Sequence, residues 1–323
     1  MVANYPFATI DPNVGVVPVP DRRLEKLAEV TKTEEKMEFL PPIVPATVRF
    51  VDIAGLVKGA AEGAGLGNKF LSHIREVDLI CEVVRAFPDG EIIREGSVEP
   101  RGDVETINTE LILADMQTLA KAESGKRLAD SKLAQIKESA TKKLLAGLDK
   151  GELASEVELS DEERDAAREL QLLTAKKFIY VFNVNTISEW EGAQKAVEEL
   201  KVTGSRVVVI DAKLEAELAI LSPDEQEEYL ESLGVKDSGV NALIRESYSA
   251  LNLISFLTTG VKETRAWPIP LGMKAPQAAG TIHTDFEKAF IKAEAVNFES
   301  FVAAGGWKKC REAGSVRDRK SVV

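Results

Sequence analysis

Apolar positions near the start of the chain fall into short runs separated by a helical pattern. Residues 47–52 and 79–86 are rich in apolar and β-branched residues, and the second run is nearly continuous in apolar character. A helical spacing from about residue 67 to residue 76 lies between them. Near-continuous apolar runs are typical of buried parallel strands. The pattern therefore predicts a strand–helix–strand unit of a doubly wound α/β sheet.

The same alternation returns later in the chain. Residues 177–183 and 205–211 read as strands rich in β-branched residues, with a helix predicted at about 189–200. Between the two sheet segments, from about residue 104 to 174, glycine and proline nearly vanish and leucines recur at helical spacing. We therefore predict that an antiparallel pair of long helices is inserted within one α/β domain. Such an arm is either a partner-binding lever or a spacer.

Local signals refine this picture. Ser160 is followed three residues later by Glu163, which predicts a capping box at a helix start. After Gly234, a helix at 240–251 leads to predicted short strands at 262–269 and 278–283. This last part of the chain is expected to be a small α+β module.

Charge and composition limit the classes of partner. The net charge of −12 should repel nucleic acid from the protein as a whole, so contact with RNA needs a local basic patch. Residues 307–323 hold six Lys or Arg against two acidic residues, either as such a patch or as a solvated tail. No apolar run reaches the roughly 20 residues that span a bilayer, and the first residues lack a signal-peptide pattern. With only two cysteines, the composition favours a cytoplasmic protein without a membrane partner.

One strand end carries a motif with chemical meaning. Asp52-Ile-Ala-Gly55 follows a predicted strand, where GTPase-like enzymes place a carboxylate directed at Mg²⁺ and a glycine N–H at the γ-phosphate. Alone, this motif is weak, because an aspartate often caps a turn. Further glycines after it, and Asn183 and Asp211 at later strand ends, favour a nucleotide site.

Several longer segments resemble one family. They are Asn4-Tyr-Pro-Phe-Ala-Thr-Ile-Asp-Pro-Asn13, Val51-Asp-Ile-Ala-Gly-Leu-Val-Lys-Gly-Ala60, Gly65-Leu-Gly-Asn-Lys-Phe-Leu71, Ile107-Asn-Thr-Glu-Leu111, Tyr180-Val-Phe-Asn-Val184, Arg265-Ala-Trp267 and Ile282-His-Thr-Asp-Phe-Glu287. Together they resemble the YchF branch, the Obg-like ATPases, of the Obg superfamily of P-loop NTPases. The similarity runs over nearly the whole chain.

This resemblance implies an Mg²⁺-dependent ATPase that prefers ATP over GTP. Thr9, Asp52 and Gly55 correspond to the catalytic switch residues, and Thr9 and Asp52 also approach the metal. The purine would be read by one loop with Asn183, Val184 and Thr186, and by a second loop with Asp211, Ala212 and Lys213. Thr186 stands where the family commonly has an acidic residue, which should weaken purine selectivity.

The resemblance also implies domains and partners. Residues 1–103 and 175–234 would form an Obg-type nucleotide-binding domain, 104–174 an inserted coiled-coil arm, and 252–323 a TGS domain with a β-grasp-like fold and a shortened C-terminus. The implied partner is the ribosome, as the large subunit or the 70S particle, with ribosomal RNA contacted through basic patches. The implied role is regulation of translation or of a stress response.

A strand and a Gly-x-x-x-x-Gly-Lys-Ser phosphate loop open the family, ahead of the segment that matches Asn4. This chain begins past that loop, and its only Gly-Lys pair, Gly125-Lys126, lies in the predicted arm. Two functions therefore stay open: an ATPase whose loop precedes Met1, and a non-hydrolysing ribosome- or RNA-binding module that acts through the arm and the TGS domain. His73 and His283 lack the spaced partners of a metal site. His73 is expected on a solvated helix face, with a catalytic role as the alternative, and His283 is expected to be structural.

Overall fold

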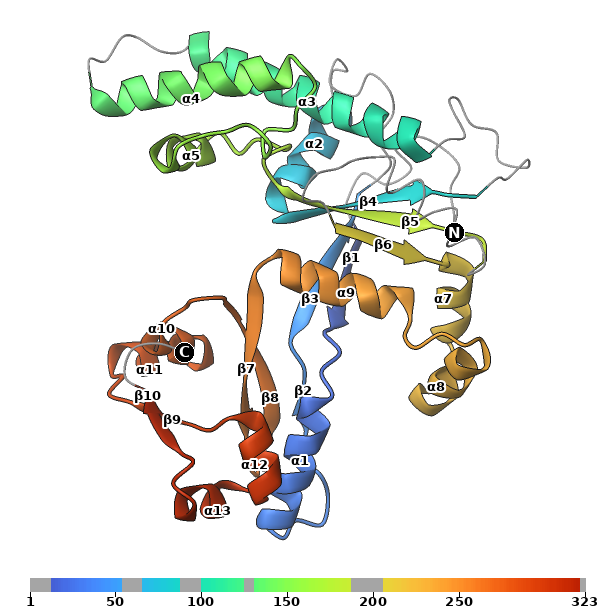
Figure 1. Ribbon diagram of the computed structural model, residues 1–323, viewed down its shortest axis with the longest axis vertical. Helices are drawn as coiled ribbons and strands as arrows, with labels where there is room; N and C mark the ends of the chain where they lie inside the picture. The colour runs from blue at the N-terminus through green and yellow to red at the C-terminus, as the bar shows by residue number, and fades with distance from the viewer. Residues whose placement is uncertain (1–12, 54–65, 88–99, 125–130, 187–205, 320–323) are drawn as a thin grey trace. The chain divides into compact units, whose positions relative to one another are not determined.

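The computed structural model describes residues 13–53, 66–87, 100–124, 131–186 and 206–319 (Figure 1). The chain divides into two compact units. The first comprises residues 1–15 and 51–243, and the second comprises residues 16–50 and 244–323.

A parallel sheet forms the centre of the first unit. Strands β4 (Leu79–Arg85), β5 (Lys177–Asn183) and β6 (Arg206–Ile210) pair in that order, with β5 in the middle. All five residues from 178 to 182 are buried, as expected for a parallel strand covered on both faces. The strands predicted from the apolar runs at 79–86, 177–183 and 205–211 are thus confirmed. The helix predicted at 189–200 lies outside the described residues.

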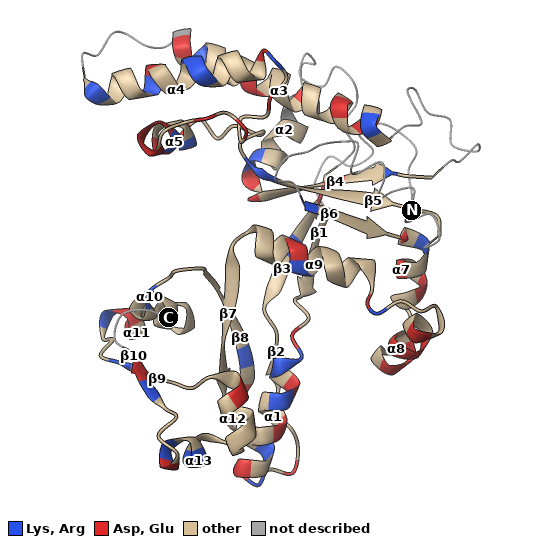
Figure 2. Cartoon of the chain, viewed as in Figure 1, with Lys and Arg blue, Asp and Glu red and all other residues tan. Residues whose placement is uncertain are grey.

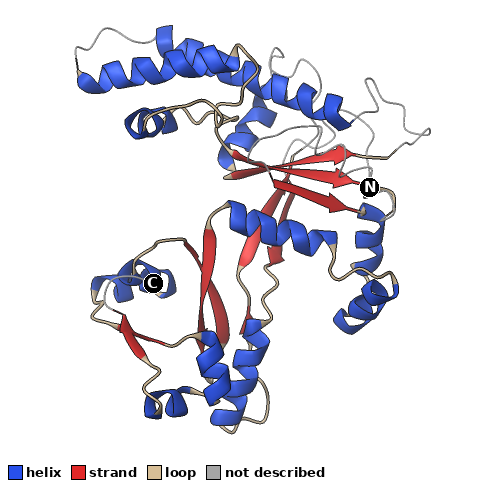
Figure 3. Cartoon of the chain, in the orientation of Figure 1, coloured by secondary structure: helices blue, strands red, loops and turns tan. Residues whose placement is uncertain are grey.

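Helices α2 (Leu66–Glu76), α3 (Pro100–Ser124), α4 (Lys132–Leu148) and α5 (Asp161–Arg168) also belong to this unit (Figure 3). Leucines of α3 and α4 share one core with the aromatic residues of β5; the most deeply buried members are Leu111, Leu119, Leu144, Tyr180 and Phe182. Burying each such side chain contributes about 1.5–3 kcal/mol. The helical segment that interrupts the sheet in sequence is therefore also its covering layer.

The start of α5 has the predicted capping box. Ser160 Oγ accepts a hydrogen bond from the Glu163 amide at 3.2 Å, and Glu163 Oε2 accepts one from the Ser160 amide at 2.9 Å. Two amides at the helix start are thereby satisfied.

After β6, the chain forms α7 (Ala212–Leu218), α8 (Pro223–Ser232) and the start of α9 (Gly239–Ala250). Gly239 packs directly on β6, because a Cβ there would lie 3.0 Å from the Val209 carbonyl oxygen and 3.1 Å from Ile210 Cα. Glu215 Oε1 accepts a hydrogen bond from the Gly239 amide at 2.6 Å. Glycine is therefore the residue that lets the chain return to the carboxyl end of β6.

The second unit contains a sheet of mixed direction. Strand β7 (Leu253–Thr259) is antiparallel to β8 (Thr264–Pro270), and β2 (Ile43–Val44) runs parallel to β8. Helix α1 (Arg23–Glu34) contacts both β7 and β8. The core residues are Val19, Leu24, Ala46, Val48, Ile244, Tyr248 and Ala266. Strands β1 (Asn13–Pro18) and β3 (Thr47–Asp52) pair in a separate two-stranded sheet. The strand predicted at 47–52 is thus confirmed, but its predicted place in one sheet with 79–86 was wrong, because β3 pairs with β1 and not within the sheet of β4.

The remaining elements of this unit are short. They are α10 (Ala275–Ile282), α11 (Thr284–Lys288), β9 (Ala293–Ala295), α12 (Phe298–Ala304), α13 (Trp307–Glu312) and β10 (Arg317–Arg319), with β9 antiparallel to β10. The strand predicted at 278–283 was wrong, because these residues form α10. Pro276 lies in the first turn of α10, where proline is favoured, and Gln277 Oε1 accepts a hydrogen bond from the Lys274 amide at 3.3 Å. These start signals outweigh the short apolar run.

The carboxylate of Glu34 fixes the start of α13. It accepts hydrogen bonds from the amides of Trp307 and Lys308 at 2.9 and 2.7 Å. Gly306 (φ 127°) allows this approach, because a Cβ at that position would lie 2.3 Å from the Glu34 carboxyl carbon. Among the described residues, no helix is long and apolar enough to cross a membrane.

Candidate functional site

The carboxyl ends of the three parallel strands are joined by backbone hydrogen bonds. The Ala86 amide donates to the Asn183 carbonyl at 2.8 Å, and the Val184 amide donates to the Ile210 carbonyl at 2.8 Å. These bonds continue the ladder one residue beyond β4 and β5. In open α/β sheets, ligands bind at the carboxyl ends of the strands. This edge is therefore the expected location of a ligand site.

Two loops meet there through a side chain. Asn183 Oδ1 accepts a hydrogen bond from the Ala212 amide at 3.1 Å, which ties the end of β5 to the start of α7. Asp211 Oδ1 caps α7 by accepting from the amides of Lys213 and Leu214 at 3.1 and 3.0 Å. An aspartate at this cap position also interacts favourably with the helix dipole.

Exposure differs among these residues. Asn183 and Asp211 are half-buried and Val184 is buried, whereas Thr186, Ala212 and Lys213 are exposed. The structure thus brings Asn183 and Val184 together with residues 211–213. The amide oxygen of Asn183 is held in place, and the outer loop residues face solvent.

The residues predicted for the phosphate side are placed differently. Asp52 is the last residue of β3 and its side chain is exposed, while the next residue, Ile53, packs against the core of the first unit. Thr9 and Gly55 lie outside the described residues. Asp52 is in a different sheet from Asn183, and Asp211 directly follows β6 of the sheet that contains Asn183. Within the described ranges, no group of three or more His, Cys, Asp or Glu could hold a metal ion by itself.

A buried carboxyl group in β4 was not predicted. Glu82 is only 4% exposed, and neither of its oxygens has a hydrogen-bond partner among the described residues. Burial, with a smaller contribution from Asp103, raises the pKa of Glu82 to about 8. Tyr180 lies opposite Glu82 on β5, and burial raises the pKa of this tyrosine to about 12. The available signal was a single glutamate within an otherwise apolar strand.

The two histidines lie at or within different helices. His283 Nδ1 accepts a hydrogen bond from the Asp285 amide at 3.2 Å and so caps α11. His73 lies on α2 and is half-buried. The cap explains His283 as a structural residue.

Comparison with known proteins shows the fold class of the chain. A family model described as a 50S ribosome-binding GTPase matches residues 1–101. The solved structure of the Schizosaccharomyces pombe YchF GTPase superposes with a TM-score of 0.81 and 36% identity, covering 99% of this chain and 88% of that chain. The chain therefore has the α/β fold of P-loop GTPases.

The family follows from closer relatives. The YchF-GTPase_C model, described as a protein of unknown function, matches residues 253–321. The ribosome-binding ATPase YchF of Bacillus subtilis is 46% identical over 328 residues, which covers 98% of this chain and 87% of the relative. The protein of the same name from Escherichia coli O157:H7 is 45% identical over 326 residues, covering 98% and 86%. The chain belongs to the YchF family.

Proposed function

We propose that this protein is an Mg²⁺-dependent ATPase that acts on the ribosome in regulating translation or a stress response, and that it prefers ATP over GTP. The observation that carries the proposal is the hydrogen bond between Asn183 Oδ1 and the Ala212 amide. It joins two loops at the sheet edge where nucleotides bind in folds of this class. The names of the relatives, which are ribosome-binding ATPases, support the same function.

The base-binding side of the site would use both loops. The Asn183 side chain and the Val184 backbone would contact the purine edge, with Thr186 beside them. Asp211, Ala212 and Lys213 would cover the other side of the base. Because Asn183 is already fixed by Ala212, little conformational entropy is lost when a base binds. Thr186 lacks the carboxylate that would accept hydrogen bonds from guanine, which is consistent with a preference for adenine.

The phosphate side would use Asp52, Thr9 and Gly55. Mg²⁺ in nucleotide sites is held by one or two protein oxygens together with phosphate oxygens and water. The exposed Asp52 carboxylate and the hydroxyl of Thr9 are hard oxygen donors that fit this pattern. When bound, the metal would neutralise charge on the β- and γ-phosphates. Asp52 would orient it, and the Gly55 amide would contact the γ-phosphate.

The proposal is tested with a chain extended at its N-terminus by a strand and a Gly-x-x-x-x-Gly-Lys-Ser loop, since no such motif occurs among the 323 residues. In this extended chain, Thr9→Ala should reduce hydrolysis more than ATP binding, because its contacts depend on the metal and the γ-phosphate. Asp52→Asn should weaken the Mg²⁺-dependent binding of ATP more than that of ADP. Equal losses for both nucleotides would contradict the role of Asp52.

The alternative is a ribosome- or RNA-binding module that does not hydrolyse nucleotide. The exposed Lys308 and Lys309 on α13 favour some contact with RNA. The two functions differ in one measurement. Ribosome binding by the extended chain should depend on ATP in the ATPase and should be unaffected by nucleotide in the binding module.

A further inference from the structure

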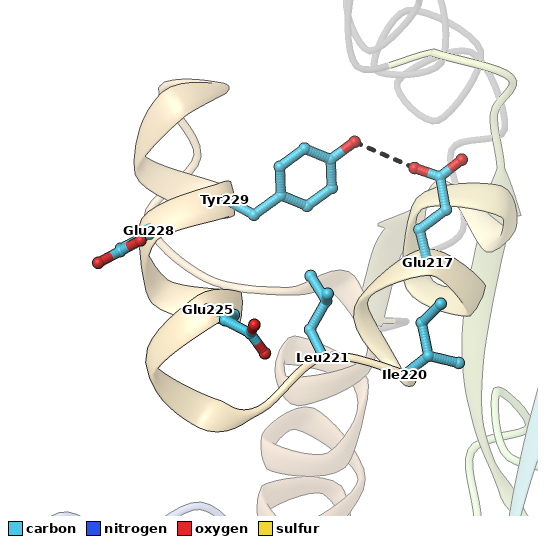
Figure 4. Close-up of a pocket in the computed structure, with 6 residues that line it drawn as sticks. All are labelled: Glu217, Ile220, Leu221, Glu225, Glu228 and Tyr229. Carbon is cyan, nitrogen blue, oxygen red and sulfur yellow. Dashed lines mark hydrogen bonds between the residues drawn. The ribbon is translucent and has the colours of Figure 1, made fainter.

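Helices α7 and α8 line an open hollow that the proposed nucleotide site does not use. Its volume is about 500 Å³, and it is lined by Glu217, Ile220, Leu221, Glu225, Glu228 and Tyr229 (Figure 4). Leu221 lies between the two helices, where the chain passes from one to the other, and Ile220 lies just after the end of α7. Ile220 is 85% exposed, so its apolar side chain stands at the open edge of the hollow and is available to a partner.

Hydrogen bonds hold this hollow in shape. Tyr229 of α8 donates to Glu217 Oε2 of α7 at 3.0 Å and so links the two helices. Gln226 Nε2 donates to the carbonyls of Leu218 and Leu221 at 3.0 and 3.1 Å and fixes the connecting turn. Glu225 Oε2 accepts from the amide and hydroxyl of Ser222 at 2.8 and 2.6 Å. A surface fixed in this way loses little entropy on binding a partner.

The charge around the hollow has one sign. Residues 214–235 contain seven acidic residues and no Lys or Arg. Figure 2 shows much of α8 in the colour of acidic residues. The hydrogen bonds from Ser222 lower the pKa of Glu225, so this carboxylate stays ionised well below neutral pH. An exposed isoleucine among acidic side chains complements a partner that carries an apolar residue between cations.

We propose that the hollow between α7 and α8 is a docking site for a basic protein segment, whose apolar side chain covers Ile220 while flanking arginine or lysine side chains pair with Glu217, Glu225 and Glu228. Phosphate groups are repelled by the same carboxylates, so the partner is a protein and not a nucleic acid. The arrangement resembles peptide recognition in which an apolar anchor supplies affinity and the charged rim supplies specificity. This surface goes beyond the proposed ATPase function.

The test uses the full chain and a short labelled peptide in which arginine and leucine alternate, with binding measured by fluorescence anisotropy. Ile220→Ser should weaken binding roughly tenfold, and Glu228→Gln several-fold, as expected for contacts at the centre and rim of a small interface. The matched control is Glu231→Gln, which makes the same charge change on α8 outside the hollow and should alter binding less than about twofold. All three side chains are exposed, so the variants should melt like the parent chain.

A second peptide, with serine in place of leucine, separates apolar docking from general attraction. The serine peptide should bind the parent chain weakly. The Ile220→Ser change should not weaken its binding further, because this peptide already lacks the leucine that would contact Ile220. The proposal is overturned if the leucine peptide does not bind, or if Glu231→Gln weakens binding as much as Glu228→Gln. It is also overturned if a single-stranded RNA of matched length binds the parent chain and loses affinity in the Ile220→Ser variant.

Discussion

Thr174 donates two hydrogen bonds to the buried carboxylate of Asp115, from its amide at 2.8 Å and from its hydroxyl at 2.7 Å. The Leu173 amide donates a third at 2.7 Å. Asp115 and Thr174 have no exposed surface. A side chain of α3 therefore satisfies the backbone of the segment that leads into β5, and it fixes the helical insertion to the sheet.

Removing the Asp115 carboxylate should lower the free energy of unfolding. Asp115→Ala leaves three buried donors without an acceptor, and each such donor costs about 1–3 kcal/mol. We expect a loss of about 3 kcal/mol or more in the free energy of unfolding, measured by denaturant titration. Asp165→Ala, at an exposed carboxylate that pairs with Arg168, should change it by less than about 0.5 kcal/mol. A loss for Asp115→Ala as small as that control would show that the three bonds do not stabilise the fold.

The free energy of unfolding should decrease as the pH rises from mildly acidic to mildly alkaline values, because of Glu82. Its pKa is about 8 in the folded protein and 4.5 when unperturbed. Between these values the folded state keeps the proton and the unfolded state releases it. The stabilising effect of the neutral carboxyl is thus complete below pH 4.5 and is lost as the pH rises through 8. The slope is at most about 1.4 kcal/mol per pH unit for one proton.

The Glu82→Gln variant checks this dependence, because glutamine has a similar shape and does not titrate. Denaturant titrations of both proteins from about pH 5 to pH 8.5 should give a smaller decline in the variant. If the two proteins lose stability in parallel over this range, Glu82 does not carry the proton.

A third prediction concerns ribosomal RNA and rests on the proposed function. Lys308 and Lys309 are exposed on α13, in a local region of net positive charge. Replacing both with alanine should weaken RNA binding and should lower the salt dependence by about one unit of slope per lost phosphate contact. Lys26→Ala with Lys262→Ala, two exposed lysines elsewhere in the chain, is the matched control. Equal effects of the two pairs would point to general electrostatics.

The long-range sheet of the first unit was predictable because its strands are apolar and continuous. A parallel strand such as β5 is buried on both faces, so nearly all of its side chains are apolar and the sequence pattern is easily recognised. Ser160 and Glu163 were predictable for a local reason, since a capping box needs only residues three apart. Asn183 and Asp211 could be placed at strand ends, but their link through Ala212 depends on strand pairing.

Other features could not be predicted because tertiary packing decides them. Residues 275–282 are helical, since start signals at Pro276 and Gln277 prevail over an apolar run that is short enough to fit either element. The capping of α13 by Glu34 joins residues more than 270 positions apart, and no local pattern marks it. The buried Glu82 contradicts the apolar pattern of its own strand, and such exceptions become visible only with the fold.

The claim at the centre is that Asn183 belongs to the base-reading loop of an ATP site. The measurement is a matched set of dissociation constants for ATP, ADP, GTP and GDP, on the extended chain and on its Asn183→Ala variant. The purine is common to ATP and ADP, so both constants should rise by a similar factor, equivalent to about 1–3 kcal/mol for an unpaired base edge. Four constants unchanged in a variant that melts like its parent would show that the loop at Asn183 does not read the base.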